Sequence, residues 1–72
     1  MKPNVKGLLF NSHSVGEIEV LSVHPHGDAL VALYKHTMTS VITGREVISH
    51  RVAIISQRPS GDWFVPNNVI AS

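Results

Sequence analysis

Apolar and polar residues alternate along much of the chain with the period of a β-strand. The first such segment runs from Gly16 to Val23, where Ile18 and Val20 alternate with two glutamates. Successive side chains of a strand point to opposite faces, so this pattern predicts a half-buried strand. The next segment, His24-Pro25-His26-Gly27-Asp28, is expected to end the strand, because proline lacks a backbone donor and glycine suits a tight turn.

The segment from Ala29 to Lys35 fits two structures. Asp28 suits the cap of a helix over residues 29–36, in which Leu30, Leu33 and Tyr34 would share one face. A chain reversal followed by largely apolar residues is also typical of the second strand of a hairpin. Residues 37–43 favour β structure and would not extend a helix. We therefore predict a strand, with the helix as the alternative.

The strongest β signal lies between Glu46 and Gln57, after a predicted turn at Thr43-Gly44-Arg45. A period of two places its residues on two faces. We expect the even-numbered face to enter the core: Ile48, His50, Val52 and Ile54. The odd-numbered face is then expected to lie on the other side of the sheet: Val47, Ser49, Arg51, Ala53 and Ile55.

The C-terminal residues predict a turn over 58–62 and a short returning strand, Trp63-Phe64-Val65. Pro66-Asn67-Asn68 is expected to end that strand, and Val69-Ile70 to fold back as a one-turn closure. Residues 1–72 therefore form one predicted domain that is mainly β, with a small antiparallel sheet curled into a partial barrel. The alternative fold is α+β, with one helix at 29–36.

Composition narrows the function classes. The 72 residues include no cysteine, and a soluble domain without cysteine fits a reducing interior such as a bacterial cytoplasm. Six Lys and Arg residues against five Asp and Glu residues do not make the dense basic surface typical of nucleic-acid-binding proteins. The longest apolar run, Ala29 to Tyr34, is far shorter than the roughly 20 residues that span a bilayer, so no membrane segment is expected.

Histidines are the main candidates for metal chemistry. His24, His26 and Asp28 are spaced two apart, so in a regular strand they would share a face, and His36 or His50 would complete a zinc site. The proline and glycine between them are expected to bend this segment, and no second close pair follows. We therefore predict no metal and no cofactor, and interpret these histidines as surface residues.

Catalysis has less support, because the carboxylates and the glycines are scattered and a domain of this size has little room for a pocket. We predict that the protein is not an enzyme. Binding of single-stranded nucleic acid is the alternative function, with Tyr34, Trp63 or Phe64 stacking on bases. The cations that would align beside them are Lys35, His36, Arg45, Arg51 and Arg58.

An apolar group precedes the first clear strand. Residues 1–13 are expected to form a flexible or interface-forming segment, unless they pair as an edge strand that buries Leu8 and Phe10. The candidate partner-binding residues are Lys2, Val5, Lys6, Leu8, Leu9 and Phe10.

Three fragments resemble the SH3 domain family: Val31-Ala32-Leu33-Tyr34, Gly61-Asp62-Trp63 and Pro66-Asn67-Asn68-Val69. The resemblance implies a partial SH3-like barrel. It does not carry over the polyproline-binding groove, because Lys35 and His36 replace the acidic residues expected after Tyr34. A second tryptophan is absent, and only two residues separate Trp63 from Pro66.

The whole chain resembles a family of small transcription regulators from a lytic Xanthomonas phage, in its length, its opening Met1-Lys2-Pro3-Asn4, its lack of cysteine and its near-neutral charge. The resemblance implies a non-enzymatic protein in the host bacterial cytoplasm that binds RNA polymerase at the N-terminal region of the largest subunit. It further implies inhibition of promoter-dependent initiation through disturbed σ-factor association, together with an effect on termination.

Overall fold

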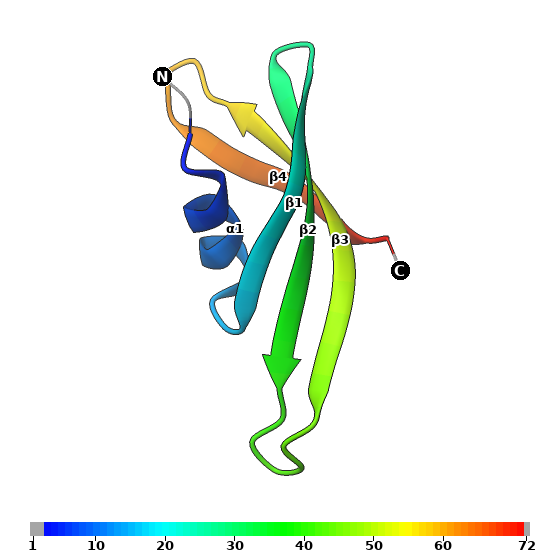
Figure 1. The fold of residues 1–72 in the computed structure, drawn as a ribbon. Helices are drawn as coiled ribbons and strands as arrows, with labels where there is room; N and C mark the ends of the chain where they lie inside the picture. The colour runs from blue at the N-terminus through cyan, green and yellow to red at the C-terminus, as the bar shows by residue number, and fades with distance from the viewer. Residues whose placement is uncertain (1–2, 72) are drawn as a thin grey trace.

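The computed structural model describes residues 3–71 and contains one helix and one four-stranded sheet (Figure 1). The elements are α1 (Val5–His13), β1 (Glu17–His26), β2 (Ala29–Thr39), β3 (Glu46–Gln57) and β4 (Trp63–Ile70). Each strand pairs antiparallel with the next, in the order β1-β2-β3-β4. The predicted mainly β fold with a small antiparallel sheet is confirmed.

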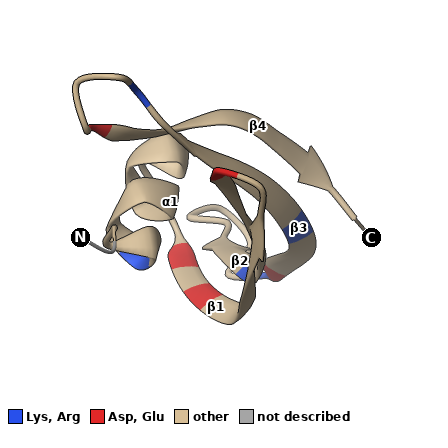
Figure 2. Ribbon diagram, turned by 90° about the horizontal axis from the view of Figure 1, so that it is seen from above, with Lys and Arg blue, Asp and Glu red and all other residues tan. Residues whose placement is uncertain are grey.

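The sheet is curled but is not closed into a barrel, because β1 and β4 remain its two edges. The helix α1 packs against both of these edge strands. Seen from above, α1 lies within the curl of the sheet (Figure 2). The helix therefore lies between β1 and β4, the two strands that would have to pair for the sheet to close into a barrel.

The ambiguous segment after Asp28 is a strand, and the alternative helix over 29–36 is wrong. Residues 30–39 of β2 pair with β3, and its first nine residues also pair with β1. The expected end of the preceding strand is also wrong, because β1 continues to His26 and pairs Pro25 with Leu30. An edge strand tolerates proline, since one side of its backbone has no strand to donate to.

The bounds predicted for β3 are confirmed, but the predicted core face is wrong. Ala53 and Ile55 are fully buried, whereas Ile48 and His50 on the even-numbered face are exposed. The reason is that α1 covers only one face of the sheet, the face on which Ala53 lies beside Ala32 of β2. The number of β-branched residues on a face does not show which face a helix will cover.

The last strand is longer than predicted, because β4 runs through Pro66-Asn67-Asn68 to Ile70. The expected one-turn closure at Val69-Ile70 is therefore wrong. The pairing of β3 with β4 shifts between Ile54 and Ser56, and Pro66 lies opposite this irregularity. Bulges and edge strands are the places where a sheet accepts proline, so the strand continues past it.

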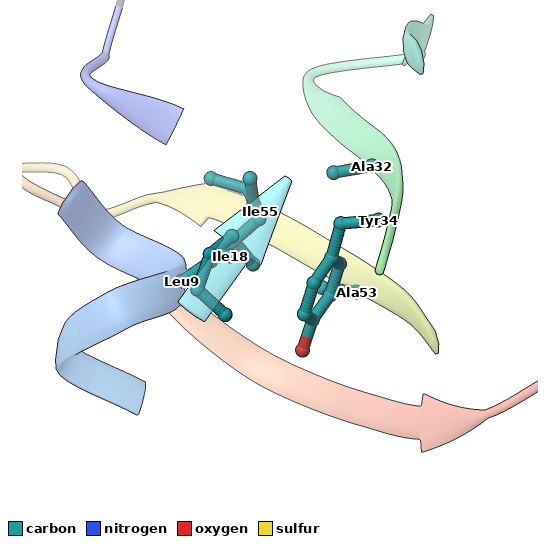
Figure 3. Close-up of a cluster of buried hydrophobic side chains, with 6 residues drawn as sticks. All are labelled: Leu9, Ile18, Ala32, Tyr34, Ala53 and Ile55. Carbon is teal, nitrogen blue, oxygen red and sulfur yellow. The ribbon is translucent and has the colours of Figure 1, made fainter. Parts of the chain in front are cut away.

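The core lies between α1 and the concave face of the sheet (Figure 3). Its fully or nearly fully buried apolar residues come from four elements: Leu9, Ile18, Ala32, Tyr34, Ala53 and Ile55. The core is small, so each large member contributes a substantial part of the buried apolar surface. Half-buried apolar residues pack around it: Val5, Leu8, Val20, Leu30, Trp63 and Val65.

Candidate protein-docking surface

The helix α1 has well-defined ends. Asn4 caps its first turn, with the Asn4 side-chain oxygen accepting a hydrogen bond from the Gly7 N–H at 3.1 Å. At the other end Ser14 adopts the left-handed conformation, and its N–H donates to the Phe10 carbonyl at 2.7 Å. These caps fix the helix ends, so the side chains of α1 have defined directions.

The outer face of α1 presents an aromatic ring and a cation. Leu9 points into the core, while Lys6 and Phe10, four residues apart, are both exposed along one flank of the helix. Phe10 is 45% exposed, a large fraction for an aromatic residue that directly follows a fully buried residue, Leu9. The helix therefore displays an apolar anchor whose backbone is held by the core.

A shallow hollow of about 370 Å³ adjoins this ring, between α1 and the start of β1. It is lined by Lys6, Phe10, Gly16, Glu17 and Ile18. The single ion pair within residues 3–71 joins Lys35 and Glu19, so Lys6 and Glu17 are not paired with each other. An aromatic ring flanked by a cation and an anion, neither of which is ion-paired in the described part of the chain, is suited to a protein partner with mixed polar and apolar character.

Glycine is required at position 16 by both conformation and space. Gly16 has φ +90°, a region that other residues rarely adopt. A Cβ atom placed there would lie 2.6 Å from His36 Nε2 and 2.7 Å from the Thr37 carbonyl oxygen. The turn between α1 and β1 therefore lies directly against β2, which fixes the position of the hollow.

The six predicted partner-binding residues divide between surface and core. Lys2 lies outside the described residues. Lys6 and Phe10 are exposed, and Val5 and Leu8 are half-buried against the core. The expected exposure of Leu9 is wrong, because Leu9 is fully buried. The segment is a helix, and a helix turns one side toward the sheet and leaves the other in solvent. The sequence predicted an exposed segment or an edge strand instead, and neither of these has the 3.6-residue repeat that buries Leu9.

A polar cluster holds the end of α1 against the sheet. His13 Nε2 lies 2.6 Å from the Tyr34 hydroxyl, to which the Asn68 side-chain amide donates a hydrogen bond. Arg51 Nε donates to the Asn68 side-chain oxygen at 2.8 Å. These hydrogen bonds join α1, β2, β3 and β4 at one point, so the cluster fixes the helix to the sheet.

His13 also stacks on His36, with ring centroids 3.9 Å apart and an angle of 18° between the planes. His36 Nε2 lies 2.8 Å from the Val15 carbonyl oxygen, so this nitrogen donates. Burial lowers the pKa of His13, and the positive charges of His36 and Arg51 lower that pKa further. The folded protein therefore favours neutral His13.

Two of the side chains suggested for nucleic-acid contact are buried. Tyr34 is fully buried and His36 is 5% exposed, so neither reaches a base or a phosphate. Trp63 is half-buried against the core, and Arg58 lies over the Phe64 ring at 4.1 Å. Figure 2 shows the Lys and Arg residues dispersed over the fold, with acidic residues between them.

The histidines considered for a metal lie apart from any third ligand. His24 and His26 are both exposed on β1, and Asp28 lies beyond the end of that strand in the turn. Within residues 3–71, no group of three or more His, Asp or Glu side chains is arranged to hold a metal ion.

Comparisons with protein-family models, curated proteins and solved structures find no match to this chain. In the part of the chain that the structure describes, no helix has the length and apolar character needed to cross a membrane.

Proposed function

We propose that the protein is a phage-type regulator that binds host bacterial RNA polymerase through the Phe10 face of α1. In this proposal it inhibits promoter-dependent initiation by disturbing σ-factor association, and it also affects termination. The observation that carries the docking surface is the 45% exposed Phe10 ring on a capped helix, beside the charges of Lys6 and Glu17. The polymerase is chosen from the whole-chain resemblance to small phage transcription regulators.

The rigidity of α1 supports a docking role. Leu9 anchors the middle of the helix in the core, and His13 fastens its end to Tyr34. Because the helix backbone that carries Phe10 is already fixed, binding costs little further backbone entropy, so more of the contact energy is available for affinity. A specific interface needs about 800 Å² on each partner, and a few anchors such as Phe10 carry most of the energy.

The surface around Phe10 also suits a regulator that acts by occupying a site on its partner. Lys6 and Glu17 border the hollow from opposite elements, so a partner can be recognised by charges on either side of the aromatic anchor. By the same resemblance, the expected partner surface is the N-terminal region of the largest polymerase subunit, in the host bacterial cytoplasm.

A capture experiment tests the proposal. Tagged protein is incubated with RNA polymerase core enzyme and with holoenzyme, and promoter-dependent transcription is measured in parallel. We expect stoichiometric capture and reduced initiation, both lost in Phe10→Asp. Val69→Asp is the matched control, because Val69 is 55% exposed on β4 and lies outside the proposed surface. Leu8 is avoided because it packs against the core.

Two results would contradict the proposal. Capture that is equal for Phe10→Asp and Val69→Asp would move the interface away from α1. Absence of capture from the polymerase of a matching host, with retention on single-stranded nucleic acid instead, would favour the alternative nucleic-acid function.

A further inference from the structure

The hairpin formed by β2 and β3 extends beyond the rest of the sheet and ends in two exposed aliphatic side chains (Figure 1). Val41 is 100% exposed and Ile42 is 90% exposed. β1 begins at Glu17, opposite Thr37 of β2, so neither β1 nor α1 covers the last part of the hairpin. Because the tip projects from the rest of the molecule, its two apolar side chains can enter a pocket on another molecule.

Most N–H groups of this tip already donate hydrogen bonds within the turn. Ser40 Oγ accepts from the N–H groups of Ile42 and Thr43, at 3.3 and 3.2 Å. The Gly44 N–H donates to the Ser40 carbonyl and the Ser40 N–H to the Arg45 carbonyl, both at 2.9 Å. Residues 40–44 carry no charge. Moving the tip out of water therefore leaves few unsatisfied N–H groups and no charge to desolvate, which lowers the cost of burying this turn.

The chain itself contains a pocket that matches this tip. An apolar notch of about 450 Å³ lies where the start of α1 meets the end of β1 and the start of β2. Within residues 3–71, the side chains that line it are all apolar: Pro3, Val5, Val23, Pro25 and Leu30. The volume falls within the range of pockets that hold small ligands, so it has room for more than one branched side chain.

The tip and the notch lie at opposite ends of a molecule 44 Å long (Figure 1). The tip of one molecule therefore does not reach its own notch, but two antiparallel molecules place each tip near the notch of the other. A two-fold arrangement makes such a contact twice, which compensates for a small area in each contact.

We propose that the protein self-associates through insertion of the Val41–Ile42 tip into the apolar notch of a second copy. A second copy of this chain is the expected partner because the chain contains both the tip and the notch. Residues 40–44 carry no charge, and the notch has no charged residue among its described lining residues. This contact does not use Phe10 or Lys6, so it stands apart from the proposed polymerase interface.

Sedimentation velocity from micromolar to about 1 mM protein tests the contact, since weak self-association has dissociation constants up to this range. We expect concentration-dependent association of the unmodified chain. In Val41→Asp/Ile42→Asp we expect the dissociation constant to rise at least about tenfold, since two buried aliphatic side chains are replaced by charges. Val47→Asp is the matched control, because Val47 is also exposed on the hairpin but lies outside the tip.

Mixing variants provides the second test. Val23→Asp places a charge in the notch at a residue that is 38% exposed, and its self-association is expected to weaken as in the tip variant. A mixture of the two variants restores one of the two contacts, with the intact tip of Val23→Asp in the intact notch of the tip variant. The mixture should therefore associate more strongly than either variant by itself and more weakly than the unmodified chain. Methyl NMR signals of Leu30 in the tip variant should shift when Val23→Asp is added.

Several outcomes would overturn the proposal. These are a chain that stays monomeric at about 1 mM, association that the tip substitutions leave unchanged, or variants that do not complement each other. Phe10→Asp should associate like the unmodified chain, so failure of the polymerase proposal would leave this result unaffected.

Discussion

The two halves of β2 and β3 belong to the same strands but lie in different surroundings. In the half near β1 and β4, the concave face is covered by α1, and Tyr34, Ala53 and Ile55 are fully buried. In the half that forms the projecting hairpin, Met38, Val47 and Ile48 are between 42% and 64% exposed. The strands have similar β-branched character throughout. The difference shows that a cover on the sheet, and not strand formation, determines which half becomes core.

The largest effect is expected from truncating the residue through which α1 covers the sheet. Leu9→Ala should reduce the free energy of unfolding by about 2–5 kcal/mol, because it leaves a cavity in a small core. Ile42→Ala on the hairpin should change it by less than about 0.5 kcal/mol, because Ile42 is 90% exposed. Urea unfolding followed by circular dichroism measures both. A similar loss of unfolding free energy in the two variants would contradict the conclusion that only the half of β2 and β3 covered by α1 forms core.

The second prediction compares two glycines that both have positive φ. Gly16→Ala introduces a Cβ atom 2.6 Å from His36 Nε2, whereas nothing lies within 4 Å of a Cβ atom at Gly44. Both variants bear the cost of a left-handed conformation, roughly 1–2 kcal/mol. Gly16→Ala should lose at least about 1 kcal/mol more, because backbone and a buried ring must move. Equal losses in thermal unfolding would show that the contact with β2 is not tight.

The smallest expected effect concerns pH and the attachment of α1. The folded pKa of His13 is below its ordinary value of 6.5, so the unfolded chain binds more protons at this site in mildly acidic solution. The contribution of neutral His13 to the free energy of unfolding should therefore be fully present above pH 6.5. It should be lost as the pH falls from 6.5 through the folded pKa.

Substitution of His13 separates its contribution from that of other groups. In His13→Gln, the free energy of unfolding should depend less on pH between neutral and mildly acidic solution than in the unmodified chain. Chemical unfolding at a series of pH values gives this comparison. An unchanged pH dependence would mean that His13 does not titrate differently in the folded and unfolded states.

Features encoded by neighbouring residues were predictable from the sequence. The run of β-branched residues gave the bounds of β3, and Thr43-Gly44-Arg45 marked the turn before it. The helix α1 was missed because Gly7 weakens its propensity and the segment is short. The signals that indicate it are the cap at Asn4 and the helical spacing of Val5, Leu8 and Leu9.

Features that depend on distant residues were not predictable in the same way. His13, Tyr34, Arg51 and Asn68 are brought together only by the strand order and the position of α1, and no local motif links them. The core face of β3 was mispredicted for the same reason. Of the candidate docking residues, Lys6 and Phe10 are exposed, and Leu9 is not, because a helix gives its segment two distinct sides.

Site-specific photo-crosslinking at position 10 tests the central proposal most directly. A photoreactive phenylalanine derivative replaces Phe10 in one variant and Val69 in a second, and each is irradiated with bacterial RNA polymerase holoenzyme. We predict crosslinks from position 10 to the largest subunit, within its N-terminal region, and few from position 69. Crosslinks to the polymerase only from position 69, or from neither position, would contradict docking through α1.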